Sequence, residues 1–254
     1  MTSGEPPPSA VARLEILPCI AECYRVVFRD FPALTKIALL PIVLSILIGL
    51  ASSLFLPTYD GVFWHFATLL PWTVLGVAWL RRSLDLDGSA PARFFPDFER
   101  RHLRFFVFSL ALTLIDLPFW LLPQLLDDGA GGDVQREVLD WAIYALRIYV
   151  ELRFAFAYAA AAAEEPYSLA FAWRHTRGQS LRVFIIVGLA VVLPWRLFDY
   201  VLGGLGLSDF IVYLAWHGGL WITQGVFLTC IAVAFRRSTG WVPKPDKNIL
   251  ERFE

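Results

Sequence analysis

Three charged residues lie inside long apolar stretches of the sequence. Asp116 falls in one stretch, and Arg147 and Glu151 fall in the next. Charged side chains are rare in apolar segments of this length, and where they occur they act as counter-ions, proton relays or binding groups for ionic solutes. Arginine keeps its proton in proteins, so Arg147 predicts a fixed cation, whereas either carboxylate can carry a proton.

The spacing of these residues places them at one depth. A short polar segment centred near residues 131–132 separates the two stretches, so residues of equal depth in an antiparallel helix pair have numbers that sum to about 263. Asp116 and Arg147 meet this condition, and Arg147 and Glu151 share a helix face at i,i+4. The sequence therefore predicts a cluster of Asp116, Arg147 and Glu151.

Two roles for this cluster stay open. It is either a structural clamp between two helices, or a translocation site in which Arg147 binds an anionic group and a carboxylate carries a proton. Room for water beside Arg147 would favour translocation, whereas a seal formed by Tyr149 and Phe154 would favour the clamp.

The elements that position the cluster are predicted to be membrane-spanning helices. The chain is 57% hydrophobic and 18% charged, which is more apolar than a soluble domain. A span needs about 20 mostly apolar residues, and continuous apolar runs favour helices over barrel strands. Six spans are predicted, at residues 33–56, 62–80, 103–126, 138–163, 181–201 and 210–235.

The connections between the spans predict three hairpins. Short connections join spans one and two, three and four, and five and six. A stretch of mixed aromatic and arginine residues precedes each hairpin, at residues 14–31, 92–102 and 167–177, and such helices lie in the headgroup plane. We expect an all-α, polytopic membrane fold with an internal repeat of roughly 70–80 residues. We expect residues 1–10 to form a disordered lead, residues 11–238 to form the membrane domain and residues 239–254 to form a cytoplasmic tail.

The distribution of basic residues predicts the orientation. Of the 22 lysines and arginines, all but Arg136, Arg147 and Arg196 lie near the termini or the two long connections. Basic residues concentrate on the cytoplasmic side of a membrane. We therefore expect both termini in the cytoplasm and the three interfacial helices on the same side. Six arginines of these helices are candidate contacts for anionic lipid headgroups. They are Arg25, Arg29, Arg100, Arg101, Arg174 and Arg177.

A second polar cluster is expected near the opposite face. Arg196 and Asp199 are spaced i,i+3 in span five, which predicts a surface ion pair within a belt of aromatic residues, and His217 of span six lies at a similar depth. Histidines without a carboxylate partner do not predict a metal site. Arg153, near the cytoplasmic end of span four, is expected to extend toward the headgroups.

The cysteines predict packing more than chemistry. Cys19 and Cys23 are spaced i,i+4 and share a helix face. Small, buried apolar side chains are the leading interpretation, and a redox pair or a metal site is the alternative.

One stretch carries a family resemblance. Residues 172–184, Ala-Trp-Arg-His-Thr-Arg-Gly-Gln-Ser-Leu-Arg-Val-Phe, lead into span five. With the unit of interfacial helix and hairpin, they resemble the six-helix membrane domain attached to some bacterial glycerophosphodiester phosphodiesterases and its stand-alone YciC-like relatives, over about residues 10–238. The resemblance implies a bacterial inner-membrane protein. It supplies no catalytic residue, because the longest polar stretch, residues 81–102, is too short for the soluble catalytic domain and an extra threonine separates His175 from Arg177.

The expected function is therefore not enzymatic. The sequence contains no P-loop, nucleophile elbow, HExxH or CxxC motif, so no cofactor or metal is expected. The net charge of −1 argues against nucleic-acid binding. The leading expectation is a structural or interaction role in the bacterial envelope, with anionic lipids, protein partners or a second copy as partners. The alternative is a small-solute transporter or channel that uses the Asp116–Arg147–Glu151 cluster, and a lipid-modifying enzyme is a weaker third.

Overall fold

The computed structural model describes residues 14–55, 66–86, 98–126, 133–165 and 169–243. The regular elements of these ranges are helices, as expected for the all-α class. They are α1 (Ile16–Arg29), α2 (Phe31–Phe55), α4 (Leu69–Ser83), α5 (Arg100–Leu126), α6 (Asp133–Phe154), α7 (Phe156–Ala162), α8 (Leu169–Thr176), α9 (Ser180–Val187), the π-helical segment η1 (Gly188–Val192), α10 (Leu193–Gly204) and α11 (Asp209–Thr239).

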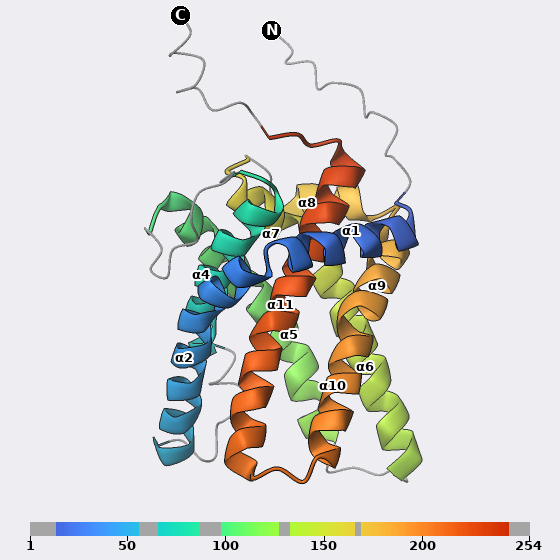
Figure 1. Cartoon of the computed structure of the whole chain (residues 1–254). Helices are drawn as coiled ribbons and strands as arrows, with labels where there is room; N and C mark the ends of the chain where they lie inside the picture. The colour runs from blue at the N-terminus through green and yellow to red at the C-terminus, as the bar shows by residue number, and fades with distance from the viewer. Residues whose placement is uncertain (1–13, 56–65, 87–97, 127–132, 166–168, 244–254) are drawn as a thin grey trace, which may run out of the picture.

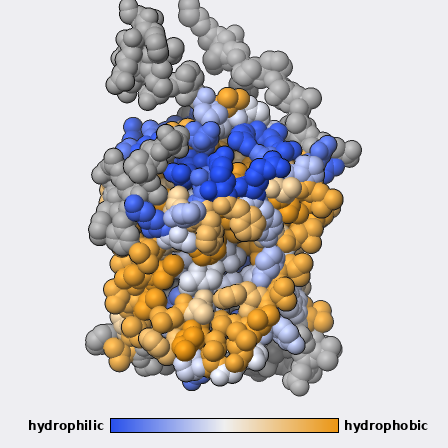
Figure 2. All heavy atoms as spheres, viewed as in Figure 1, coloured by the Kyte–Doolittle hydropathy of each residue, from blue (hydrophilic) through white to orange (hydrophobic). Residues whose placement is uncertain are grey.

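Four helical segments are long and apolar enough to cross a membrane. They are Phe31–Ser52, Arg100–Phe119, Ser180–Gly204 and Asp209–Thr239. Their outward faces carry large apolar side chains, such as Leu47 and Leu54 on α2 and Leu193 and Leu197 on α10. In Figure 2 these hydrophobic surfaces flank the molecule below a hydrophilic band. The protein is therefore a helical protein with surfaces suited to lipid.

The other two predicted spans differ from expectation. The described part of span 62–80 is mainly α4, which has 15 residues, and residues 62–65 lie outside the described residues. The predicted span 138–163 is divided at Ala155 into α6 and α7. The sequence of α6 includes Asp140, Arg147, Glu151 and Arg153, and these charged residues lower its mean hydropathy. The helix nevertheless packs beside the apolar α5.

An inner group of three helices, α4, α7 and α11, forms the core. The three contact one another, every side chain of α7 is buried, and most of α4 and the second half of α11 are buried as well. The alanines of α7 let the neighbouring helices approach closely. The indole N–H of Trp79 on α4 donates to the carbonyl of Gly225 and the hydroxyl of Thr229 on α11, both at 2.8 Å. This buried contact fixes α4 against α11.

The three inner helices end alike. Asp85 and Glu164 follow the C-caps of α4 and α7 with φ values of 62° and 59°, and Gly240 caps α11 with φ 66°. After α4, the amides of Asp85 and Leu86 donate to the carbonyls of Arg82 and Arg81, and Glu164 and Glu165 repeat this pattern on Ala161 and Ala160. This is the Schellman cap. The sequence separations between Asp85, Glu164 and Gly240 fall within the roughly 70–80 residues of the predicted repeat.

Two of the predicted interfacial stretches are helices at one end of the molecule. α1 lies across the ends of the long helices, and α8 lies at the same end (Figure 1). α1 turns Cys19, Cys23 and Val27 toward the core, and the carboxylate of Glu22 accepts hydrogen bonds from both Arg236 and Arg237 of α11. Of the second stretch, residues 92–97 lie outside the described residues, as do residues 1–10 of the predicted lead and residues 244–254 of the predicted tail.

Candidate functional site

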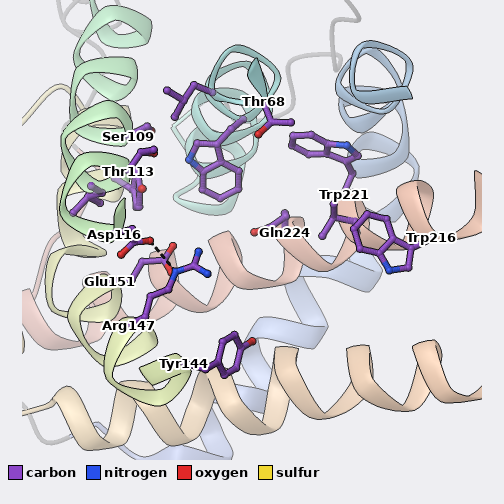
Figure 3. A pocket seen from close by; sticks show the side chains of 15 residues that line it. Thr68, Ser109, Thr113, Asp116, Tyr144, Arg147, Glu151, Trp216, Trp221 and Gln224 are labelled. Atoms are coloured by element: carbon purple, nitrogen blue, oxygen red, sulfur yellow. Dashed lines mark hydrogen bonds and ion pairs between the residues drawn. The ribbon is translucent and has the colours of Figure 1, made fainter. Parts of the chain in front are cut away.

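Asp116, Arg147 and Glu151 line one cavity of about 530 Å³. The cavity is lined by residues of α4, α5, α6, α7 and α11. Figure 3 shows the three charged side chains converging from α5 and α6, with Gln224 of α11 facing them. The complete lining consists of Thr68, Leu69, Trp72, Ser109, Leu112, Thr113, Asp116, Tyr144, Arg147, Glu151, Tyr158, Trp216, Leu220, Trp221 and Gln224.

Asp116 and Arg147 form an ion pair between α5 and α6. Arg147 Nε donates to Asp116 Oδ2 at 3.1 Å. The two side chains keep 12% and 21% of their surface accessible, so the pair is largely buried but has room for water beside it. The terminal nitrogens of the guanidinium are turned toward the middle of the cavity (Figure 3). The structure thus brings together the two residues that the depth argument paired.

Glu151 adds a second carboxylate to the same cavity. It lies one helical turn after Arg147 on α6 and points toward the Asp116–Arg147 pair (Figure 3). The described lining residues therefore include two acids and one base. A charge buried without compensation is costly, so this arrangement favours the binding of a positive charge or a proton.

The residues proposed to seal Arg147 do not do so. Tyr149 is 41% exposed. The ring of Phe154 packs on that of Trp173, with 5.1 Å between the centroids. Neither side chain lines the cavity. This is the geometry that favours a solute site over a sealed clamp.

Aromatic side chains form much of the cavity wall. They are Trp72 from α4, Tyr144 from α6, Tyr158 from α7, and Trp216 and Trp221 from α11. The indole N–H of Trp221 donates to Ser45 Oγ of α2 at 2.7 Å. Its hydrogen-bonding group is therefore satisfied outside the cavity, and the ring itself serves as a wall.

A cluster of rings packs at one end of the cavity. Trp72 lies 6.1 Å from Phe105, 5.8 Å from Tyr158 and 6.3 Å from Phe227, measured between ring centroids. Gly76 makes room for this cluster, because a Cβ there would come within 2.2 Å of Phe105 Cζ. These rings join the cavity wall to the packing of α4, α5, α7 and α11.

Most residues of the cavity wall were not predicted from the sequence, although a signal was present on α5. Ser109, Thr113 and Asp116 are spaced i, i+4 and i+7, so they form a polar stripe on one face of an otherwise apolar helix. A comparable stripe runs through Tyr144, Arg147 and Glu151 on α6. Such stripes predict helix faces that meet at a polar interior.

The predicted cluster at the opposite face is not assembled. Arg196 and Asp199 are exposed on α10, and the described structure has no ion pair between them. The guanidinium of Arg196 instead lies over the ring of Trp141 on α6, at 5.3 Å from the ring centroid. His217 is 3% exposed and contacts the rings of Tyr213 and Trp216. The predicted Arg196–Asp199 pair is therefore wrong, because a ring from the neighbouring helix offers the cation a competing contact.

The six predicted headgroup arginines differ in exposure. Arg25, Arg29, Arg100, Arg174 and Arg177 are exposed. Arg29 pairs with Asp30 at 2.8 Å. The prediction for Arg101 is wrong, because its side chain is 17% exposed and binds Glu164 at 2.6 Å as well as Glu99, so its charge is satisfied within the protein.

Arg153 does not extend to the headgroups. It is 2% exposed and donates to Ser180 Oγ and to the carbonyl of Trp173, both at 2.7 Å. Its guanidinium also lies 4.2 Å from the centre of the Trp173 ring. Thr176 Oγ1 donates to the carbonyl of Arg153 at 2.8 Å. Neutral acceptors and a ring therefore hold the buried cation and join α6 to α8 and α9.

The cysteines are free and buried. Burial raises the pKa of Cys19 to about 11. The nearby Cys230 of α11 and burial raise the pKa of Cys23, so Cys23 has Cys230 as a neighbour in addition to Cys19 on its own helix. Among the described residues, no group of three histidine, cysteine or acidic side chains is placed to hold a metal ion.

The comparisons with known proteins give no family. The chain matches no protein-family model, and neither the curated proteins nor the solved structures yield a match. The resemblance to YciC-like membrane domains stays a prediction.

Proposed function

We propose that the protein is a membrane carrier that binds a small solute in the cavity around Arg147. The observation that carries this proposal is the cavity of about 530 Å³ beside the Asp116–Arg147 pair. Small-molecule sites occupy about 300–1,000 Å³ and combine apolar walls with a few polar groups. A clamp between two helices needs no such volume, because protein interiors are otherwise close-packed.

The proposed membrane topology has six spans and cytoplasmic termini in a bacterial inner membrane. α4 and the α6–α7 pair would be the second and fourth crossings. Arg81 and Arg82 end α4, and Arg236 and Arg237 end α11, at the same end of the molecule as α1. This concentration of basic residues supports a cytoplasmic location for that end.

A role in lipid organisation is the second candidate, and the surface of α1 and α8 favours it. Arg25 on α1 and Arg174 on α8 are exposed, and so are the apolar Leu17, Phe28 and Trp173 on the same helices. Exposed rings and guanidinium groups on a helix that lies across the span ends suit the headgroup region of an anionic membrane. This role is compatible with transport.

Accessibility of the cavity tests the carrier proposal. We would introduce Gln224→Cys and treat right-side-out and inverted membrane vesicles with a small charged methanethiosulfonate. A carrier exposes its site alternately to both sides, so the thiol should react in both preparations. Thr229→Cys, on the same helix and fully buried, is the matched control. Reaction in neither preparation would support the clamp, and reaction from one side alone would indicate a receptor.

A further inference from the structure

We infer that the cavity takes a small organic cation, which exchanges with a proton held by the two carboxylates of the Asp116–Arg147–Glu151 cluster. This inference rests on the proposed function and names its substrate class. It follows from the charge of the lining, the chemistry of the walls and the way in which the one guanidinium is already engaged.

The charge of the lining favours a cation. Among the described residues that line the cavity, Asp116 and Glu151 are acids and Arg147 is the base. Arg147 already donates to Asp116 at 3.1 Å. With both carboxylates ionised, one negative charge is left over in a largely buried space. Neutrality then requires either one proton or one monovalent cation.

The walls favour an organic cation over a hydrated ion. The faces of aromatic rings attract cations, and tryptophan does so most strongly. Trp216 and Trp221 of α11 lie across the cavity from Asp116 and Glu151, and Tyr144 of α6 lies below the two carboxylates in the view of Figure 3. The apolar Leu112 and Leu220 complete the wall. An ammonium group near Glu151 with an apolar body against the rings would satisfy this lining.

An anion fits this cavity poorly. It would have to compete with Asp116 for the guanidinium of Arg147, and it would meet the repulsion of Glu151 at close range. The original expectation that Arg147 binds an anionic group is therefore replaced by a positioning role. Arg147 holds Asp116 in place and leaves Glu151 as the group that meets the solute.

Exchange with a proton follows from the same balance. The titratable groups that line the cavity with Glu151 are Asp116 from α5, Tyr144 and Arg147 from its own helix and Tyr158 from α7, whereas the lining residues of α4 and α11 carry no charge. Arginine and tyrosine do not change charge between pH 5 and 8. The carboxylates are thus the groups that can exchange a proton, and binding of one cation should release about one proton.

The test uses the purified full-length protein and three probes of matched shape. Phenyltrimethylammonium carries a fixed positive charge, tert-butylbenzene is its neutral counterpart and benzenesulfonate is an anion. Binding is measured by titration calorimetry against empty micelles, in buffers of different ionisation enthalpy. We expect only the cation to bind, with release of about one proton and an affinity that falls about tenfold for each pH unit below the titration of the carboxylates.

A matched pair of variants tests whether Glu151 is the carboxylate that binds the cation. Glu151→Gln should lower the affinity for phenyltrimethylammonium by about thirtyfold or more and abolish proton release. Asp199→Asn, which removes an exposed carboxylate on α10, should leave the affinity unchanged. The proton count in the unaltered protein keeps the test decisive if Glu151→Gln fails to fold.

The outcomes separate this inference from the proposed function. Binding of benzenesulfonate in place of the cation, or equal binding of tert-butylbenzene, would overturn the inference and leave a solute site in place. Cation binding without proton release, or unchanged by Glu151→Gln, would also overturn it. If no probe binds, the solute site itself is refuted and the inference fails with it.

Discussion

Asp85 and Glu164 adopt the same left-handed backbone conformation, each one residue beyond the C-cap of an inner helix. Each position completes the same pair of backbone hydrogen bonds. Glycine is the usual residue at this position because it lacks the Cβ that crowds the backbone there, and α11 has Gly240 at its own left-handed cap. The two acidic residues therefore retain a small backbone strain that the glycine cap of α11 avoids.

Replacement of Asp85 by glycine should stabilise the protein. Asp85 is exposed, so relief of the left-handed strain should raise the free energy of unfolding by about 0.5 kcal/mol, which a thermal melt in mild detergent would detect as a shift of about 1–2 °C. Asp85→Ala keeps the Cβ and is the control. An equal gain from alanine would show that loss of the charge, not relief of the backbone, is responsible.

The corresponding change at Glu164 should give a smaller gain or a loss. Glu164 binds Arg101 at 2.6 Å and lies 3.5 Å from Arg81, so Glu164→Gly removes two ion pairs along with the strain. Exposed ion pairs contribute about 0–1 kcal/mol each. The melting temperature of Glu164→Gly should therefore lie below that of Asp85→Gly. A larger increase for Glu164→Gly would mean that these ion pairs contribute nothing.

Removal of Arg147 should destabilise the protein, and a second substitution should restore it. Arg147→Leu leaves Asp116 and Glu151 without their cation, which should cost about 2 kcal/mol or more. Arg147→Leu combined with Asp116→Leu removes both partners of the ion pair and should recover most of the thermal stability. Arg196→Leu, at an exposed position on α10, is the control for the loss of an arginine. A double variant no more stable than the single one would contradict the pairing.

The same double variant separates structure from transport. If the pair only joins α5 to α6, the recovered protein should bind phenyltrimethylammonium as before. If the pair also positions Glu151 for the solute, folding should recover while the affinity for the cation falls, although Glu151 keeps the net charge of the lining at −1. Titration calorimetry on the double variant and on the unaltered protein, both prepared as equally monodisperse samples, distinguishes these results.

The contact between two of the cavity residues could be predicted from sequence, but the cavity could not. Asp116 and Arg147 met because α5 and α6 are regular helices joined by a short connection, so that counting from the turn fixes relative depth. Trp216, Trp221 and Gln224 come from α11, which is separated from this hairpin by α7 to α10. Helix periodicity gives the face of a residue on its own helix and does not say which other hairpin that face meets.

Competing local contacts explain the other differences. Arg153 has no carboxylate in its hydrogen-bonding set, and hydropathy alone gave no sign that Ser180 and the carbonyl of Trp173 would hold it. The break at Ala155 lies between an α6 rich in charged residues and an alanine-rich α7. One apolar window covered both segments, so the sequence predicted a single span.

The close packing of Gly76 against Phe105 predicts a sensitive position. A methyl group at Gly76 would lie 2.2 Å from Phe105 Cζ and 2.6 Å from Cε1, so the ring must move into Trp72 and Tyr158. Overpacking of this kind costs about 1–3 kcal/mol. Gly76→Ala should lower the melting temperature, whereas Gly203→Ala, with no neighbouring atom within 4 Å of its new Cβ, should not. Equal melting temperatures would mean that the ring cluster is loosely packed.

Cys19 and Cys23 should be unreactive in the folded protein. Both are almost fully buried, at 1% and 0% exposure. A pKa raised to about 11 keeps Cys19 protonated at neutral pH, and the thiolate is the reactive form. Maleimide at pH 7 should therefore modify neither residue until the protein is unfolded in detergent such as dodecyl sulfate, as read by intact mass. Rapid modification of the native protein would show that α1 detaches from α11. The Gln224→Cys experiment would then need a variant without the native cysteines, because it depends on their not reacting.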